Sequence, residues 1–422
     1  MSFNNLQQAL EYINSLHHQT IDLGLDRVAL VAERLNLLNP RCPVITVAGT
    51  NGKGSTVAGL ESILLAAGFQ VGTFTSPFLY RFNEQIRVLG KETPDDVLLK
   101  AFEKIEMARE ETSLTPFEFT TLAAFEIFKL NNLDVWILEV GLGGRLDAVN
   151  VLNPDVAIVT SIAMDHMDRL GDTREKIGYE KAGIFRSNRP AICGDFDPPK
   201  TLIARSQELS TPLFKQGEDF GFTQQEDTWT WWHKTKTGMK TYVLPIPKLG
   251  LQNMACVLMA IEILQSKLTV SHAAMAQGLS ALNLHGRIQY IPGKVETILD
   301  VSHNPAAATW LARALKRKIC KGKTRAIFSM LSDKDISATL QVMKESIDEW
   351  WIAPLDTSRG ASLAAMLAAF KQTEIEEIKS FDCIKTAFQN AQEVSSEWDR
   401  IVVFGSFYTV AAVNLNSAVE IR

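Results

Sequence analysis

The chain has 422 residues, 46% hydrophobic and 22% charged, a composition typical of a soluble globular protein with a substantial core. Its length predicts two or three domains of about 150 residues each. The formal net charge of −5 argues against nucleic acid as the main partner, since proteins that bind the phosphate backbone are usually basic. No apolar run reaches about 18 residues, which excludes a spanning helix, and the polar N-terminus is not a secretory signal.

Alternating helices and strands are predicted from the start of the chain. Short apolar runs are typical of buried parallel strands, and apolar residues three or four positions apart mark the helices. In order, the elements are a helix through Phe3, Leu6, Leu10 and Ile13, a strand at 43–48, a helix through Val57, Leu60 and Leu64 that ends at Gly68, a strand at 69–75, a helix through Leu98, Phe102 and Ile105, and strands at 133–140 and 155–161.

The third of these helices has a start signal in Thr93-Pro94-Asp95-Asp96. Thr93 is predicted as the N-cap, Pro94 as the first helical residue, and the two acids as favourable charges in the first turn.

The second half of the chain begins with a polar, tryptophan-containing meander at 222–243, which we assign to the first domain. A second α/β series follows, with a helix that starts at Pro305 and is capped by Asn304. Its strands are predicted at 295–301, 325–331, 350–354 and 400–404.

The predicted fold is therefore α/β with two domains, at 1–290 and 295–422, and a linker within 286–293. We expect the first domain to contain a doubly wound, mainly parallel sheet and the second to be a smaller Rossmann-like α/β domain.

The strongest motif is Gly49-Thr50-Asn51-Gly52-Lys53-Gly54-Ser55, between a strand and a helix. Glycines let the backbone direct its N–H groups at phosphate oxygens, and the positive end of the following helix favours the same anion. Lys53 adds a full charge, and Ser55 stands where a hydroxyl usually contacts phosphate or metal. The alternative is a glycine-rich turn with an exposed lysine.

Two residues at predicted strand ends are candidates for metal binding. Glu139 ends an apolar strand, at the sheet edge where open α/β folds bind ligands, and a carboxylate there suits Mg²⁺. An ion pair with Arg145 is the alternative for Glu139. For His166 the residues alone favour a hydrogen-bonded histidine, because Mg²⁺ prefers oxygen ligands.

The glycine loop resembles the nucleotide loop of the ATP-dependent Mur ligase superfamily, which implies that the first domain is a Mur-ligase-like P-loop ATPase domain. Further motifs resemble the folylpolyglutamate synthase family, in particular its bifunctional bacterial members that are also dihydrofolate synthases. The resemblance runs from about residue 20 to residue 407 and rests on Thr75-Ser76-Pro77, Leu138-Glu139-Val140-Gly141-Leu142-Gly143-Gly144-Arg145-Leu146-Asp147-Ala148, Asp165-His166, Glu180-Lys181-Ala182-Gly183-Ile184-Phe185-Arg186, His285-Gly286-Arg287, Asp300-Val301-Ser302-His303-Asn304-Pro305 and Gly405-Ser406-Phe407.

This resemblance implies an enzyme of folate metabolism that adds L-glutamate to dihydropteroate and to reduced folates through an acyl phosphate. It implies ATP, two Mg²⁺ ions and a monovalent cation such as K⁺ as cofactors. Ser76, Glu139, His166 and a carbamylated Lys181 become the magnesium ligands, and Lys53, Glu139, His166 and Lys181 the catalytic residues. An unmodified Lys181, paired with Glu180 or with phosphate, is the alternative.

The remaining site residues also follow from the resemblance. ATP would contact Thr50, Asn51, Gly52, Lys53, Gly54, Ser55, Asn253, Arg287, Asp300 and His303, with Asp300 reaching the nucleotide from the second domain. Dihydropteroate or folate would contact Asp22, Leu23, Thr115, Pro116, Phe117, Glu118, Leu146, Asp147 and Ala148. Pro116 and His285 depart from residues common in the family, which puts fine specificity in doubt rather than the reaction.

Several alternatives remain. The enzyme could be a folylpolyglutamate synthase only, or another Mur-type amide ligase, although the 48 residues before Gly49 are too few for the nucleotide-sugar domain of cell-wall Mur ligases. A nucleotide-dependent switch would not need Lys181 together with His166. Five well-separated cysteines fit a reducing cytosol. We expect a cytoplasmic monomer that binds small molecules, with no nucleic-acid or membrane partner.

Overall fold

The computed structural model describes residues 3–413. Contacts divide the chain into two compact units. Unit 1 contains the residues up to Phe78 and Phe82–Asn283, and unit 2 contains Leu79–Arg81 and the chain from Leu284 onward.

Unit 1 is built on an eight-stranded sheet in which the pairs β2–β3 and β3–β4 are antiparallel and the other neighbouring strands run parallel. Its strands lie in the order β4 (Lys91–Glu92), β3 (Ile86–Val88), β2 (Val71–Phe74), β5 (Val135–Glu139), β1 (Val44–Ala48), β6 (Val156–Val159), β7 (Ala191–Cys193) and β8 (Leu213–Lys215). Every residue of the four inner strands β2, β5, β1 and β6 is buried, as expected for strands covered on both faces.

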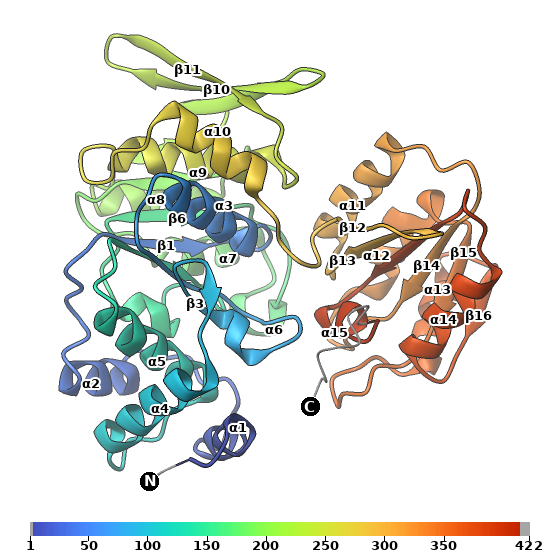
Figure 1. Cartoon of the computed structure of the whole chain (residues 1–422), viewed down its shortest axis with the longest axis horizontal. Coiled ribbons are helices and arrows are strands. Elements are labelled where there is room, and N and C mark those ends of the chain that lie inside the picture. Colours follow the sequence, from blue (N-terminus) through green and yellow to red (C-terminus); the bar gives the residue numbers. More distant parts are fainter. Residues whose placement is uncertain (1–2, 414–422) are drawn as a thin grey trace. The chain divides into compact units, whose positions relative to one another are not determined.

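Helices cover both faces of this sheet. In Figure 1, α3, α9 and α10 lie on one side of it, and α1, α2, α4 and α5 on the other. The helices are α1 (Leu6–Ser15), α2 (Asp26–Arg34), α3 (Lys53–Ala66), α4 (Asp95–Arg109), α5 (Pro116–Leu130), α6 (Met167–Leu170), α7 (Arg174–Ala182), α8 (Lys200–Glu208), α9 (Leu251–Leu264) and α10 (His272–Ala281), with 3₁₀ turns η1 (Phe82–Gln85) and η2 (Ala148–Val151). This arrangement confirms the predicted doubly wound α/β fold.

The start of α4 differs from the prediction by one residue. Pro94 is the N-cap, and it cannot cap with a side-chain hydrogen bond. Thr93 is buried before the helix, and its hydroxyl donates to the carbonyl of Ile86 at 2.7 Å. The prediction of Thr93 as N-cap was therefore wrong, because this hydroxyl holds the segment before the helix to β3.

The predicted meander is confirmed as a three-stranded antiparallel sheet of unit 1, formed by β9 (Phe220–Gln224), β10 (Thr228–Thr235) and β11 (Gly238–Pro245) (Figure 1). Trp231 is fully buried, and its indole N–H donates to the carbonyl of Ala255 in α9 at 3.1 Å. This hydrogen bond and the buried ring anchor the meander to α9.

Unit 2 is a second α/β layer structure. The order of its sheet is β12 (Gln289–Ile291), β13 (Glu296–Asp300), β17 (Arg400–Phe404), β14 (Thr324–Phe328), β15 (Glu349–Ile352) and β16 (Ile378–Ser380). Two separate apolar clusters cover its faces. Its helices are α11 (Pro305–Arg317), α12 (Ile336–Met343), α13 (Leu363–Gln372), α14 (Ile384–Val394) and α15 (Phe407–Ala411), with the 3₁₀ turn η3 (Lys344–Ser346).

Two features of unit 2 bear on the sequence predictions. Asn304 caps α11, as predicted, by accepting from the N–H of Ala307 at 2.9 Å. The segment expected to contain the linker instead holds β12, which pairs antiparallel with β13. Among residues 3–413, every helix is too short or too polar to cross a membrane.

A cluster of charges surrounds the buried side chain of Arg325 in unit 2. Its guanidinium donates to Glu349 at 2.9 Å and pairs with Asp399 at 3.0 Å. Burial alone would raise the pKa of Asp399, but backbone hydrogen bonds from Ser396 and Lys323 and the pairing with Arg325 lower it to about 2.

We expect Asp399→Asn to lower the free energy of unfolding of unit 2 by about 1.5–3 kcal/mol, the usual cost of losing hydrogen bonds to a charged group. Because the pKa of Asp399 is lowered on folding, its stabilisation is present above about pH 4 and lost as the pH falls toward 2. Urea unfolding of the full chain at neutral pH and down to pH 2 measures both effects. The exposed neighbour Glu397, changed to Gln, is the control; an Asp399→Asn variant as stable as Glu397→Gln would contradict the expectation.

Candidate functional site

The phosphate loop connects the end of β1 to the start of α3. Gly49 and Gly52 both adopt positive φ angles, +147° and +91°. A side-chain carbon at Gly49 would lie 1.7 Å from the hydroxyl oxygen of Thr160, and one at Gly52 would lie 2.4 Å from the amide oxygen of Asn253. Only glycine permits this close approach, which brings Asn253 of α9 to the loop; its contact with a nucleotide stays a prediction.

Lys53 is folded back over this loop. Its ammonium donates to the carbonyl oxygens of Gly49 at 3.2 Å and Thr50 at 3.4 Å. Ser55 lies in the first turn of α3 and is buried. The positive helix end and the lysine charge therefore act on the same small volume, which suits the terminal phosphates of a nucleotide.

Glu139 ends β5, directly beside β1 in the parallel sheet. Its side chain is nearly buried, and one carboxylate oxygen lies 3.5 Å from the position that a Cβ of Gly54 would take. The absence of a side chain at Gly54 thus lets the Glu139 carboxylate approach the first turn of α3.

Lys181 is 97% buried in the last turn of α7. Burial first, and then repulsion from Lys53, lowers the pKa of Lys181 to about 7, while the attraction of Asp165 and Asp147 opposes this shift. In the described residues 3–413 no carboxylate lies within the 4 Å of an ion pair with its ammonium.

The alternatives were an ion pair of Lys181 with Glu180 and an ion pair of Glu139 with Arg145. In the structure, Glu180 and Arg145 pair with each other. Arg145 contacts the carboxylate of Glu180 through two nitrogens, at 2.9 and 3.1 Å. Glu180 is thus the partner of Arg145, which disfavours it as the partner of Lys181 and disfavours Arg145 as the partner of Glu139.

Ser76 and His166 complete the predicted metal set. Ser76 follows β2 and is half-buried. His166 has a positive φ of 49° just before α6, and its Nε2 lies 4.0 Å from Asp165. No group of three or more His, Cys, Asp or Glu side chains suited to a metal ion occurs within the described part of the chain. The Glu139 carboxylate beside the phosphate loop nevertheless fits Mg²⁺, which usually keeps water and takes further ligands from substrate phosphates.

The predicted pterin segments meet through Arg27, which sequence reasoning missed. Its guanidinium pairs with Asp22 at 2.7 Å and with Glu118 at 3.1 Å. Glu118 also closes a capping box with Thr115 at the start of α5. Thr115 and Glu118 therefore cap the N-terminus of α5, and Arg27 connects the loop of Asp22 to it.

Asp147 is buried and serves as a backbone cap. Its carboxylate accepts from the N–H groups of Leu142 at 2.8 Å and Val149 at 3.1 Å. Burial raises the pKa of Asp147 to about 7 against the opposing effect of these hydrogen bonds. Asp147 thus shapes the loop of residues 141–147, and a direct contact with a pterin stays a prediction.

Other predicted substrate residues surround this loop. Phe117 is half-buried, and its ring lies 5.7 Å from that of Phe74 and against Gly141, where a Cβ would come within 2.6 Å of the ring. Leu23, Pro116 and Leu146 are half-buried, and Ala148 is buried at the start of η2.

The predicted nucleotide residues of unit 2 gather near Phe407 and β13. Arg287 lies over the Phe407 ring at 5.8 Å, and the ring of His303 lies 6.3 Å from it. The carboxylate of Asp300 is buried and accepts from the N–H groups of Ile288 at 2.9 Å and Ser302 at 2.8 Å. Asp300 therefore supports the turns beside Arg287 and His303.

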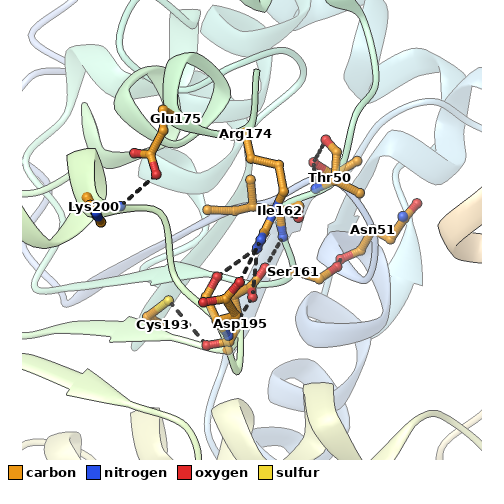
Figure 2. A network of polar contacts seen from close by, with 12 residues as sticks. Thr50, Asn51, Ser161, Ile162, Arg174, Glu175, Cys193, Asp195 and Lys200 are labelled. Atoms are coloured by element: carbon orange, nitrogen blue, oxygen red, sulfur yellow. Dashed lines mark hydrogen bonds and ion pairs between the residues drawn. The ribbon is translucent and has the colours of Figure 1, made fainter. Parts of the chain in front are cut away.

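A further polar network lies beside the phosphate loop and was also missed (Figure 2). Arg174 and Asp195 hold the main chain of Ile162 from one side, and Thr50 of the phosphate loop contacts the next residue. No motif in the sequence marks Arg174 or Asp195, because their separation along the chain matches no pattern that indicates a contact.

Known proteins resemble the chain over almost its whole length. The Mur ligase middle domain family matches residues 47–264, and the Mur ligase glutamate ligase domain family matches residues 286–407. The dihydrofolate synthase/folylpolyglutamate synthase of Escherichia coli K12 is 45% identical over 404 residues, covering 96% of this chain and 93% of that protein.

Solved structures agree with the sequence matches. E. coli FolC in complex with DHPP and ADP has a TM-score of 0.92 at 44% identity, with 97% of each chain covered. A bifunctional folylpolyglutamate synthase/dihydrofolate synthase with Mn, AMPPNP and L-glutamate bound has a TM-score of 0.90 at 44% identity, again with 97% of each chain covered.

Proposed function

Because this chain belongs to the dihydrofolate synthase/folylpolyglutamate synthase family of the Mur ligases, we propose that it is an ATP-dependent ligase that adds L-glutamate to 7,8-dihydropteroate and to tetrahydrofolates. The observation that carries the proposal is the group formed by the phosphate loop, Lys53, the buried Glu139 and the buried Lys181. Lys53 and the loop N–H groups would neutralise phosphate charge where a carboxylate is to be activated, and anions at Glu139 and Lys181 would hold divalent cations beside it.

The proposed reaction has two steps. A carboxylate oxygen of the pteroate or folate attacks the γ-phosphorus of ATP, and ADP leaves, giving an acyl phosphate. The amine of L-glutamate then attacks the acyl carbon, inorganic phosphate leaves and the nitrogen loses a proton. Lys53 and the backbone N–H groups at the start of α3 stabilise the phosphoryl charge in the first step. Thr50, Asn51, Gly52, Gly54, Ser55 and Asn253 bind ATP in this proposal, as do Arg287, Asp300 and His303 of unit 2.

We propose Mg²⁺ at two positions, held by Ser76, Glu139, His166 and carbamylated Lys181, together with a monovalent cation such as K⁺. When bound, the divalent ions would supply charge neutralisation on the phosphates. Support for a divalent ion comes from the relative described with Mn and AMPPNP bound. Support for carbamylation comes from the burial of Lys181 and its pKa of about 7, because only a neutral amine reacts with CO₂.

The pterin would bind against Phe117, Leu23, Pro116, Leu146 and Ala148, with Asp22 as a polar contact. A flat heterocycle needs an apolar or aromatic face and a few hydrogen bonds. Two related structures support these substrates, since one was solved with DHPP and another with L-glutamate. Thr115, Glu118 and Asp147 contribute through the loops that they cap.

A single assay tests the proposed function. The purified chain is given ATP, radiolabelled L-glutamate and either dihydropteroate or tetrahydrofolate, and phosphate release is followed beside label incorporation. We expect both pterins to be glutamylated and phosphate release to require both a pterin and glutamate. Activity on tetrahydrofolate alone would reduce the enzyme to a folylpolyglutamate synthase. Activity on neither pterin would favour another Mur-type amide ligase.

We propose that the enzyme acts as a monomer in the cytoplasm on small molecules. All five cysteines are free, which suits a reducing compartment. Light scattering of the purified chain tests the monomer, and a stable dimer would contradict it.

Arg27 gives a prediction about substrate binding. We expect Arg27→Gln to raise the KM for dihydropteroate about tenfold while kcat stays near wild type, because the charged contacts that order the Asp22 loop are lost and the phosphate loop is untouched. Steady-state kinetics with dihydropteroate varied measures both constants. Arg34→Gln is the matched control at the other end of α2, where Arg34 pairs with the exposed Glu110. An unchanged KM in Arg27→Gln would show that the loop does not need this contact.

A further inference from the structure

The loop between β6 and α6, residues 160–166, is joined directly to the phosphate loop. The hydroxyl of Thr50 donates to the carbonyl of Ala163 and accepts from its N–H, both at 3.1 Å. The N–H of Thr50 donates to the carbonyl of Ser161 at 2.7 Å, and the carbonyl of Asn51 accepts from the Thr160 hydroxyl at 2.8 Å. These hydrogen bonds therefore tie the position of one loop to that of the other.

The opposite side of the same loop is held by two charged side chains (Figure 2). Asp195, which follows β7, accepts from the N–H of Ile162 at 2.7 Å. Arg174, the first residue of α7, donates through Nε to the carbonyl of Ile162 at 3.1 Å and through Nη2 to Asp195 at 3.1 Å. Both main-chain groups of Ile162 are thus held by one ion pair.

We call the ion pair of Arg174 and Asp195 on the main chain of Ile162 the clamp. Its hydrogen bonds require a carboxylate at residue 195. Asp195 is largely buried, and each of its oxygens faces a donor: Ile162 on one side, Arg174 and the N–H of Asp197 on the other. An amide would place its NH₂ group against a donor in either orientation. A buried carboxylate of this kind holds its partners more firmly than neutral hydrogen bonds do.

The clamp also connects segments that carry proposed metal and ATP contacts. Arg174 begins the helix that carries Lys181, and the clamped loop leads to Asp165 and His166. Through Ile162 and Ala163, Asp195 is connected to Thr50 in the phosphate loop. The ion pair therefore connects α7, the loop of residues 160–166 and the phosphate loop, all of which carry proposed ATP or metal contacts.

We propose that Arg174 and Asp195 are positioning residues that set the phosphate loop and the His166 loop for phosphoryl transfer. This inference rests on the proposed function. Neither residue is assigned to substrate or metal; they act through the main chain of Ile162 and Ala163. Displacing a reacting phosphate by about 1 Å can cost about a hundredfold in rate, so the clamp affects the ATP step rather than pterin binding.

The test compares Asp195→Asn with Glu175→Gln. Glu175 is the neighbour of Arg174 in α7, and its carboxylate accepts from the N–H groups of Lys200 and Thr201 without reaching Ile162 (Figure 2). We expect Asp195→Asn to lower kcat/KM for ATP about 10- to 100-fold with the KM for pterin and glutamate within about twofold of wild type. Glu175→Gln should keep kcat/KM for ATP near wild type. Equal kinetic losses in the two variants, or none in Asp195→Asn, would overturn the proposal.

A double-mutant cycle with Thr50→Val separates positioning from general destabilisation. If Asp195 acts through Ala163 and Thr50, the loss of kcat/KM for ATP in the double variant should be clearly smaller than the product of the losses in the two single variants. A loss equal to that product would show independent effects and would refute the clamp. Arg174→Gln replaces Asp195→Asn if that variant does not fold. Calorimetric titration with ADP gives an independent readout, with about tenfold weaker binding expected in Asp195→Asn. A wild-type chain that binds ADP but glutamylates no pterin would contradict the proposed function, while the ADP titration would still test the clamp.

Discussion

Lys53→Ala is expected to lower kcat by about 10²–10³-fold, the usual effect of removing one donor that stabilises charge in a transition state. The ammonium of Lys53 lies over the phosphate loop, within hydrogen-bond distance of two of its carbonyl oxygens, so its charge is held at the loop that would bind a phosphoryl group. Its loss leaves the backbone N–H groups of α3 in place, so nucleotide binding should weaken less than turnover. Single-turnover phosphate release at saturating ATP measures the chemical step directly.

The control for Lys53 is a lysine that forms an ordinary surface ion pair. Lys100 in α4 pairs with Asp96 one helical turn away, and both side chains are largely exposed. Lys100→Ala should keep kcat near wild type with a stability change below about 1 kcal/mol. A Lys53→Ala variant that is folded and retains near-normal kcat would exclude the role proposed for Lys53.

The main elements of the fold could be predicted because local and global signals agree there. The strand ending at Ala48, the glycine loop and the helix from Lys53 each carry their own pattern, and their order in the chain allows one arrangement. The Asn304 cap was predictable for the same reason. Thr93 misled the prediction because its hydroxyl could bond either to the helix start or to a nearby carbonyl, and the antiparallel pairing of β3 and β4 brings the carbonyl of Ile86 within reach.

The candidate site was predictable in its phosphate-binding part and much less so elsewhere. Residue type marks Glu118, Asp147 and Asp300 as polar groups in motifs, but it does not say whether a carboxylate faces a ligand or caps a backbone N–H. Arg27 and Asp195 act through partners 91 and 33 positions away in the chain, at Glu118 and Ile162. Contacts at such separations depend on the packed sheet, so no local pattern reveals them.

The second large effect is expected at Lys181. Lys181→Ala should lower kcat about 10³-fold, because the proposed carbamate would supply a negative charge that holds a divalent cation, and that cation would neutralise the phosphates. An unmodified ammonium at this buried position would repel both Lys53 and a divalent cation. Steady-state turnover on tetrahydrofolate with saturating ATP measures the loss.

Chemical rescue distinguishes the carbamate from a plain lysine. The alanine variant leaves space beside Lys53, so acetate or formate should restore part of the activity by supplying the missing carboxylate, and methylammonium should not. Lys176→Ala is the matched control on the same helix, since Lys176 is exposed and pairs with Asp172. It should keep wild-type turnover and show no response to acetate. Rescue of Lys181→Ala by methylammonium but not by acetate, or clear density for an unmodified Lys181 in a nucleotide-bound crystal near neutral pH, would show that the ammonium itself is the working group.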